Sequence, residues 1–281
     1  MSNVKVITDS AGDIPPAMIS ELNIGVVPLS ITIDDKTYVD LVELSTEDFW
    51  RLAGISNGLP MTAAPSSEAF KDAYRTAASE GSREILVVTL SAKLSATYQS
   101  AKTAAEEFTA EDGSVKIMVL DTELATYGEG RLAVYAAQNS HKPLEELFNA
   151  VDSLRARTEV IGTIDTLDNL RKGGRIGAAA ATLGSLLSVK PIIEVRDGVV
   201  ESPAKQRTRK RALDYLISYL SERSERIDEI AVISANATDT DEFISRIQEI
   251  FPTKTILSTT IGPVIGSHAG RGTIGITFTT L

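Results

Sequence analysis

The chain has 281 residues, of which 43% are hydrophobic, 5% aromatic and none cysteine, and its formal net charge at pH 7 is −10. This length suits one large domain or two smaller ones, and the acidic balance argues against a nucleic-acid-binding protein. The absence of cysteine excludes disulfides and thiolate metal sites, and a chain whose histidines are His141 and His268 is a poor candidate for a multi-histidine metal site.

Nothing in the sequence indicates insertion into a membrane. No apolar run approaches the roughly 20 residues of a membrane-spanning helix. The first residues lead into a predicted strand at residues 4–8 rather than into a charged and then apolar leader. We therefore expect a cytoplasmic protein without stable membrane insertion.

In the first half of the chain, short apolar stretches alternate with helical patterns. Strands are predicted at residues 4–8, 25–32, 37–39, 85–88 and 116–120. Helices are predicted at residues 16–21, 46–53, 67–80, 128–140 and 143–157, with a further helix from residue 96. Residues 57–66 are interpreted as a loop. This alternation predicts a parallel sheet with helices on both faces.

The second half has a different pattern. Residues 191–195 and 199–203 are predicted to form a hairpin, because Arg196-Asp197-Gly198 suits a tight reversing turn. The other predicted strands are residues 159–164, 229–234, 254–259 and 273–278, with helices at 178–187, 208–224 and 241–251. Antiparallel pairing indicates a mixed sheet. We predict an α/β fold with two domains, residues 1–150 around a parallel sheet and residues 151–281 around a mixed one.

Two serines follow the apolar strand at residues 85–88. Ser91 lies at its carboxyl end, and Ser95 precedes the next predicted helix as its candidate N-cap. Ligands of open α/β sheets bind at this end of the strands, and a helix start favours an anion. Ser95 is therefore interpreted either as a plain helix cap or as part of an anion site.

His268 lies in a predicted loop that also contains Gly262, Gly266 and Gly270. Glycines allow the backbone to approach a ligand closely, so a role in ligand binding and an incidental position both stay open for this histidine. Residues 270–275 match G-x-G-x-x-G, but only six residues follow, too few for a dinucleotide-binding unit.

Basic residues gather at two places. Arg175 follows the turn Lys172-Gly173-Gly174, and Lys205, Arg207, Arg209, Lys210 and Arg211 surround a predicted helix start. Cations at a helix N-terminus oppose the helix dipole, so stability does not explain this second group. It is interpreted either as a solvated face or as a surface that binds a negatively charged partner.

Five segments together resemble the DegV family of bacterial fatty-acid-binding proteins. They occur in the family's order and span nearly the whole chain. The segments are Thr8-Asp9-Ser10, residues 62–66 (TAAPS), residues 90–100 (LSAKLSATYQS), residues 170–176 (LRKGGRI) and residues 262–268 (GPVIGSH).

This resemblance implies a function as well as the two-domain fold. It implies a bound long-chain fatty acid whose carboxyl group is held by Thr62 and Ser95, with His268 close by; Ser91 and Gly270 are expected in the same site. It also implies a partner, a fatty-acid kinase that phosphorylates the bound acid, whereas the binding protein itself is not an enzyme and needs no cofactor. We assign docking of that kinase to Arg175, Arg207, Arg209 and Arg211.

The sequence departs from the family pattern at two places near these residues. Ala63-Ala64 replaces the usual Ser-Gln, and Ala96 replaces the usual glycine. Neither change removes a proposed hydrogen-bond donor. Ala96 adds a Cβ atom beside Ser95, so a small change of geometry at the carboxyl group is expected.

Physical chemistry indicates how such a ligand would bind. Burial is worth ~0.8 kcal/mol per methylene, so ~14 methylenes give ~11 kcal/mol before the costs of binding. Hydrogen bonds to a charged group add ~1.5–3 kcal/mol each. The tail would therefore set the affinity and the polar residues the orientation. We expect the small side chains at residues 178–181 to leave room for the tail.

Two other functions remain open at this stage. The family's fold resembles the substrate domain of dihydroxyacetone kinases, which implies as an alternative an enzyme or a binding protein that holds a small carbonyl compound covalently through His268. The basic group from Lys205 to Arg211 would suit a regulatory nucleic-acid-binding protein, although the net charge argues against it.

Overall fold

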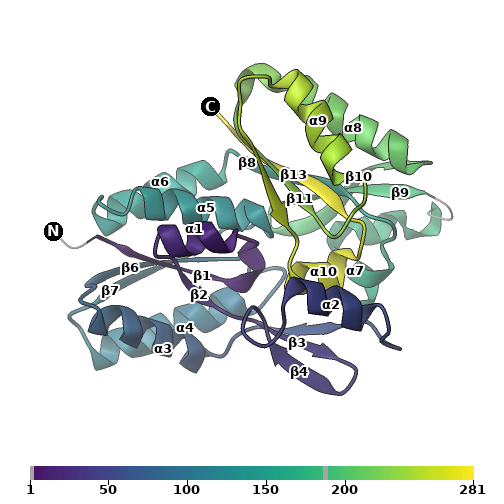
Figure 1. Ribbon diagram of the computed structural model, residues 1–281. Helices are drawn as coiled ribbons and strands as arrows, with labels where there is room; N and C mark the ends of the chain where they lie inside the picture. Colours follow the sequence, from purple (N-terminus) through teal and green to yellow (C-terminus); the bar gives the residue numbers. More distant parts are fainter. Residues whose placement is uncertain (1–2, 186–188) are drawn as a thin grey trace.

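The computed structural model describes residues 3–185 and 189–281. Within these residues the strands form three sheets, shown in Figure 1. The first has the strand order β2-β1-β6-β7, the second β10-β9-β8-β13-β11-β12, and the third β4-β3-β5. The first two are the predicted sheets, and the third was not predicted.

The four-stranded sheet is parallel throughout. Its strands are β1 (Lys5–Asp9), β2 (Gly25–Val27), β6 (Glu84–Thr89) and β7 (Lys116–Asp121). All four residues of the apolar run 85–88 in β6 are fully buried, because helices cover both faces of the sheet. This strand is confirmed as predicted.

Four helices cover this sheet, two on each face. Contacts place α3 (Ser67–Ser79) and α4 (Thr97–Glu111) on one face, and α5 (Tyr127–Gln138) and α6 (Leu144–Arg155) on the other. The short η1 (Ser10–Gly12) and α1 (Pro16–Glu21) join β1 to β2. A two-domain division at residue 150 would cut α6, which packs on β6 and β7. A division after α6 keeps this helix with its sheet.

The six-stranded sheet is mixed, which confirms the predicted fold class. Its strands are β8 (Thr158–Thr163), β9 (Lys190–Arg196), β10 (Val199–Gln206), β11 (Ile227–Ser234), β12 (Ile256–Thr260) and β13 (Ile274–Thr280). β11 and β12 are parallel, and the other neighbours are antiparallel. The predicted hairpin is the pair β9–β10.

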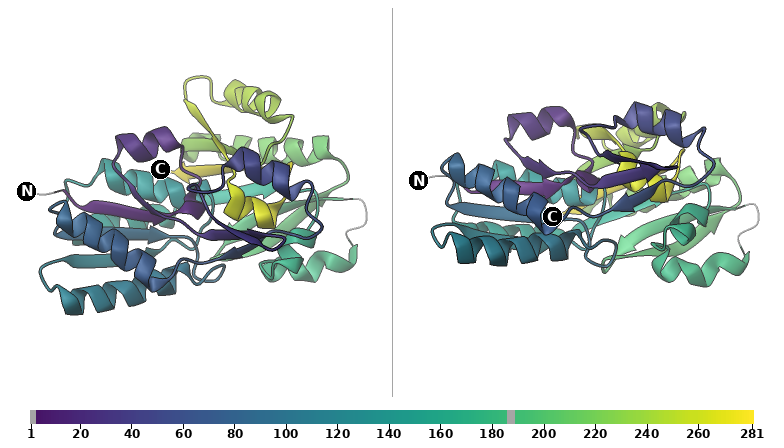
Figure 2. Two further views of the ribbon diagram at one scale, coloured as in Figure 1. Left: turned by 60° about the horizontal axis from the view of Figure 1, so that its bottom comes forward. Right: turned by 90° about the horizontal axis from the view of Figure 1, so that it is seen from below.

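The two larger sheets share one helix between them. α8 (Arg209–Ser221) and α9 (Thr240–Ile250) cover the outer face of the six-stranded sheet, whereas its inner strands β8 and β13 contact α5. α5 also contacts β1 and β6. The two halves therefore meet around α5, as the views in Figures 1 and 2 show.

Shorter elements surround the end of this junction where the third sheet lies. They are α2 (Thr46–Ala53), α7 (Asp168–Lys172), η2 (Gly177–Ser185) and α10 (Pro263–Ala269). The short η3 (Ser224–Arg226) lies elsewhere, between α8 and β11 and beside the C-terminal residue. The alanine-rich stretch predicted as a helix at residues 178–187 forms η2, a 3-10 helix. The end of that prediction, Leu186 and Leu187, lies outside the described residues.

The third sheet corrects two predictions. The strand predicted at residues 25–32 is two strands in different sheets, because the chain leaves the first sheet at Pro28, which has no N–H to donate. Its second part is β3 (Ser30–Ile33), which pairs with β4 (Lys36–Val39) and β5 (Met61–Ala63). Thr62, expected in a loop, therefore lies on a strand.

The glycine-rich segment around His268 is also corrected, because it is a helix rather than a loop. Pro263 occupies the first turn of α10, where a proline is tolerated. Gly266 faces Trp50, and a Cβ atom there would lie 2.9 Å from the indole ring. This glycine thus serves close packing of α10 on α2.

Candidate functional site

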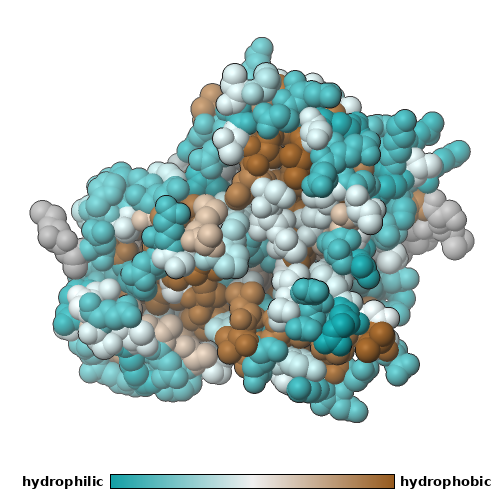
Figure 3. Space-filling model, viewed as in Figure 1, coloured by the Kyte–Doolittle hydropathy of each residue, from teal (hydrophilic) through white to brown (hydrophobic). Residues whose placement is uncertain are grey.

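A cavity lies between the two halves of the molecule, with a volume of about 900 Å³ including its open mouth. Its walls come from β5, the β6–α4 loop, the start of α5, the inner face of the six-stranded sheet, α7 and α10. The face shown in Figure 3 is mainly hydrophilic with apolar residues at several places.

The floor of the cavity is apolar. Strand alternation turns Val160, Ile193 and Ile233 toward it, while Ile161, Ile192 and Val232 pack on the opposite side under α8 and α9. Ile193 is half-buried. Such a surface favours an apolar ligand, because covering it removes hydrocarbon from water.

Polar side chains gather on one part of the wall. The hydroxyl of Thr62 lies 2.8 Å from Nε2 of His268. The positive charge of Arg175 lies close enough to His268 to lower its pKa. Nε of Arg175 donates at 3.0 Å to the carbonyl of Leu94, the residue directly before Ser95. The structure therefore brings Thr62, Ser95, His268 and Arg175 together, although Thr62 and His268 are 206 positions apart in the sequence.

His268 is held in its neutral form. Burial lowers its pKa to about 4, and the nearby charge of Arg175 acts in the same direction. Nδ1 is buried and has no hydrogen-bond partner among the described residues. Gly173 lies against this nitrogen, and a Cβ atom there would approach it to 2.5 Å. The glycine after α7 therefore makes room for the imidazole ring.

Ser95 lies one residue before the N-cap of α4, whereas the sequence predicted it to be the N-cap itself. Ala96, not Ser95, is the N-cap residue of α4, and the hydroxyl of Ser95 lies 2.9 Å from that of Thr97. Ser95 is half-buried and lines the cavity. Ala96 has a φ angle of −74°, a conformation open to any residue, so its Cβ atom causes no strain there.

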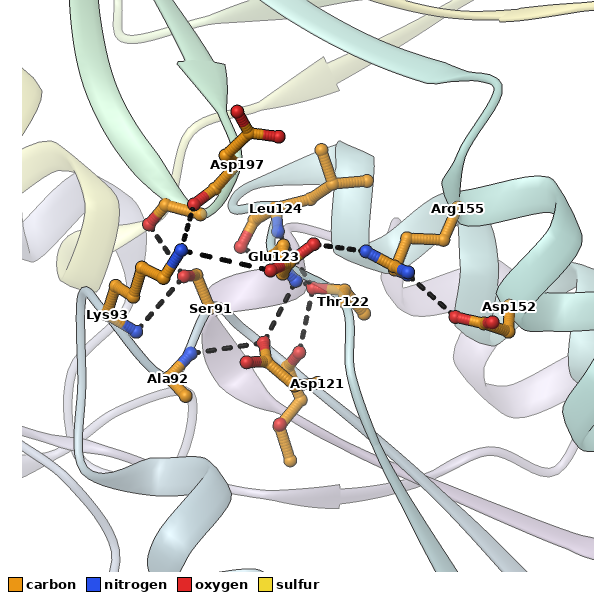
Figure 4. A network of polar contacts seen from close by, with 12 residues as sticks. Ser91, Ala92, Lys93, Asp121, Thr122, Glu123, Leu124, Asp152, Arg155 and Asp197 are labelled. Atoms are coloured by element: carbon orange, nitrogen blue, oxygen red, sulfur yellow. Dashed lines mark hydrogen bonds and ion pairs between the residues drawn. The ribbon is translucent and has the colours of Figure 1, made fainter.

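The structure does not bring Ser91 to the cavity. Its buried hydroxyl donates to the carbonyl of Gly198 at 2.7 Å, and Lys93 Nζ donates to the carbonyl of Asp197 at 2.7 Å. Figure 4 shows this network, in which Glu123 bridges Lys93 and Arg155. Ser91 therefore fixes the tip of the β9–β10 hairpin rather than contacting the cavity.

Gly270 and the alanines of η2 do not line the cavity either. Gly270 ends α10 with a φ angle of +84° and packs on Asn169, so it serves the helix end. Ala179 is fully buried against Leu170 and Val200, and Ala180 is exposed. The expectation that residues 178–181 leave room for a ligand tail is not supported by this placement.

The four arginines expected at a docking surface have different environments. Arg175 is half-buried in the cavity wall, and its Nη1 donates to the carbonyl of Gly173. Arg209 forms a two-point ion pair with Asp239 at 2.8 and 2.9 Å. Arg207 and Arg211 are exposed. Only these last two are placed as a docking surface requires.

Sequence reasoning missed a group of buried carboxyls beside the cavity. Burial raises the pKa of Asp9 and of Asp40 to about 6 and that of Asp13 to about 7. Burial also raises the pKa of Glu129, which accepts a hydrogen bond from Thr8. Burial cannot be read from the turn-like sequence Asp9 to Asp13. The only signal was the density of acidic residues around a predicted strand end.

These carboxyls predict the pH dependence of stability. Between about pH 4 and pH 7, Asp9, Asp13 and Asp40 hold protons in the folded chain that the unfolded chain has released. His268 acts oppositely, since its folded pKa of about 4 lies below the ordinary 6.5. The combined effect of the three aspartates exceeds the opposite effect of His268. The free energy of unfolding should therefore fall as pH rises through this window.

Thermal denaturation at about pH 5 and pH 8 measures this slope. Asp13→Asn should flatten it, whereas Asp35→Asn, on an exposed turn, should leave it unchanged. A melting temperature that rises across the window would contradict the assignment of these protons.

The described residues contain neither a membrane-spanning helix nor a group of metal-ligating side chains. Among residues 3–185 and 189–281, no helix has the length and apolar character needed to cross a membrane. Within the same residues, no group of three or more histidine, aspartate or glutamate side chains is placed to hold a metal ion.

Comparison with known proteins identifies similar chains. Residues 3–281 match the DegV family, described as "Uncharacterised protein, DegV family". A DegV domain-containing protein of Clostridium perfringens is 34% identical over 99% of this chain and 98% of its own length. A fatty-acid-binding DegV family protein of Thermus thermophilus has 31% identity and a TM-score of 0.88, with both chains fully covered. DegV of Bacillus subtilis, a fatty acid binding protein, has 28% identity and the same TM-score and coverage.

Proposed function

The chain belongs to the DegV family, and from this membership we propose that it binds a long-chain fatty acid in the cavity between its two halves. Thr62, Ser95 and His268 would hold the carboxyl group, and the apolar floor would cover the tail. The resemblance drawn from the sequence is confirmed at the level of the family. The solved relatives that bind fatty acids support the ligand class.

The observation that carries the proposal is the combination of two surfaces in one cavity. Val160, Ile193 and Ile233 offer hydrocarbon, and the Thr62–His268 pair, 2.8 Å apart, offers hydrogen bonds. An amphipathic molecule with one polar end fits both surfaces. A small carbonyl compound would use His268 but leave the apolar floor uncovered, so the cavity favours the lipid.

The chemistry of the polar residues suits a carboxylate. The hydroxyl of Ser95 can donate a hydrogen bond, and the hydroxyl of Thr62 can do so when Nε2–H of the neutral His268 ring donates to it. Hydrogen bonds to an ionised acceptor are shorter and stronger than neutral ones. The positive charge of Arg175, which also lines the cavity, would further favour an anionic head group.

Titration of the purified, delipidated protein with palmitate tests the proposal. We expect saturable binding of one palmitate per chain. Methyl palmitate, which has no anionic oxygen, should bind much more weakly. Absence of any saturable uptake would overturn the proposed function.

The same proposal extends to a partner. The family resemblance implies a kinase that phosphorylates the carboxyl group of the bound acid, so this chain would present its ligand without performing chemistry. Arg207 and Arg211 are exposed at the start of α8 on a chain of net charge −10. A basic patch on an acidic protein suits an acidic surface of such a kinase.

Reversal of these two charges should separate docking from lipid binding. In the double variant Arg207→Glu and Arg211→Glu, we expect formation of acyl phosphate by the cognate kinase to fall by about tenfold or more, because like charges then face each other. Palmitate affinity should stay unchanged. Arg226→Glu, at an exposed position on η3, which follows α8, is the control. Equal rates for the double variant and the control would refute this docking surface.

A further inference from the structure

Asp13 joins three segments that are distant in the sequence. Its Oδ2 accepts a hydrogen bond from the hydroxyl of Thr126 at 2.5 Å, and its Oδ1 accepts one from the backbone N–H of Gly262 at 2.8 Å. Its carbonyl oxygen accepts a third from the hydroxyl of Thr259 at 2.7 Å. The side chain thus links the end of η1 to the starts of α5 and α10.

Two of these segments form walls of the cavity. Thr126 lines the cavity at the start of α5, and α10 contributes Val264, Ile265 and His268 to another part of the lining. Gly262 is the N-cap residue of α10 and has no side chain to cap the helix itself. Asp13 does not line the cavity, so its carboxyl group acts on the walls from outside.

The segment that carries Asp13 is a firm base for these contacts. η1 packs closely on α5, because a Cβ atom on Gly130 would lie 2.1 Å from the carbonyl oxygen of Gly12. Thr126 has a φ angle of +51°, which is strained for a β-branched residue and persists only where neighbouring groups enforce it. The hydrogen bond from Thr126 to Asp13 is one such constraint.

We propose that Asp13 is a positioning residue for the fatty-acid site: its carboxyl group fixes α10 relative to the start of α5 and so places His268 opposite Thr62. This inference rests on the proposed function for its ligand. Asp13 forms three hydrogen bonds, one to the start of α5, one to the start of α10 and one to β12. These contacts do not depend on the identity of the ligand.

Trp50 provides a fluorescent probe of the position of α10. Trp50 is the only tryptophan in the sequence, and its ring packs against Gly266 in the middle of α10. Its Nε1 is buried without a hydrogen-bond partner among the described residues. A shift of α10 would therefore change the surroundings of the indole ring and the wavelength of its fluorescence.

Three variants test the proposal on the full chain. Asp13→Ala removes both side-chain acceptors. Asp13→Asn keeps the shape and can accept from Gly262 while donating to Thr126. Asp40→Ala is the matched control, because Asp40 is also a fully buried carboxyl but its side chain hydrogen-bonds Ser10 and Leu41 rather than Thr126 or Gly262. The substitution keeps the backbone N–H of Asp40, which donates to Leu29 of the cavity lining. Palmitate affinity and Trp50 emission are measured for each variant below its melting temperature.

We expect Asp13→Ala to bind palmitate about tenfold or more weakly than wild type and to shift Trp50 emission without ligand. Asp13→Asn should restore both properties, and Asp40→Ala should match wild type in both despite lower stability. Equal affinity of Asp13→Ala and wild type, or an equal loss in Asp40→Ala, would overturn the proposal.

Two provisions keep the test decisive. If Asp13→Ala does not fold, Thr126→Val removes the hydrogen bond to the Asp13 carboxyl group with little change of shape. Unchanged Trp50 emission in that variant would count against the proposal. If wild type binds no palmitate, the proposed function fails. The emission shift of Asp13→Ala relative to Asp40→Ala still decides whether Asp13 positions α10.

Discussion

Substitution of Ile193 by aspartate is expected to weaken palmitate binding by at least about 100-fold at pH values where the new side chain is ionised. Ile193 faces the cavity from β9 and is half-buried, so water can solvate a carboxylate there while the cavity is empty. A bound acyl chain would remove that water. Burial of an unpaired carboxylate costs several kcal/mol, which exceeds the contribution of any single methylene.

The pH dependence and two controls make this result specific. The loss should shrink at low pH, because the introduced carboxyl then binds a proton and becomes less costly to bury. Ile193→Leu should bind palmitate nearly as well as wild type. Ile217→Asp places the same charge on α8, against the outer core and away from the cavity. If Ile217→Asp and Ile193→Asp lose affinity equally, the acyl chain does not lie along β9.

The second large effect concerns the carboxyl group. Thr62→Val and Ser95→Ala each remove one hydroxyl donor with little change of shape. Since a hydrogen bond to a charged group contributes ~1.5–3 kcal/mol, each variant should bind palmitate about 10- to 100-fold more weakly. Thr62→Val also leaves Nε2 of His268 without its partner at 2.8 Å, so its effect should be the larger of the two.

A change of ligand separates this effect from general damage to the cavity. Hexadecanol has the tail of palmitate but no anionic oxygen, so its affinity should fall by less than about threefold in both variants. Calorimetric titration of both ligands into each variant gives the comparison. Parallel losses for the acid and the alcohol would show that Thr62 and Ser95 shape the cavity without recognising the carboxyl group.

Much of the scaffold follows from local sequence patterns. The buried strand β6 and the β9–β10 hairpin were predicted because a continuous apolar run and an Asp-Gly turn are determined by neighbouring residues. The resemblance also selected Thr62, Ser95 and His268, which the structure brings to one cavity. Their convergence depends on pairing of β3 with β5 and on packing of α10, contacts that no local pattern records.

The errors have physical causes of the same kind. The segment around His268 was predicted as a loop because its glycines suggested freedom, whereas Gly266 is there to let Trp50 approach α10. Ser91 was assigned to the ligand because of its place at a strand end, but the hairpin tip already occupies its hydroxyl. No sequence pattern singles out Asp13, because only the folded chain brings Thr126 and Gly262 to its carboxyl group.

The most direct test of the central claim is native mass spectrometry of the purified protein, followed by solvent extraction and fatty-acid analysis. The account predicts about one long-chain fatty acid per chain, released on extraction and restored when palmitate is added to the emptied protein. An empty protein that also takes up no added fatty acid would contradict it. His268 would then be tested first against small carbonyl compounds.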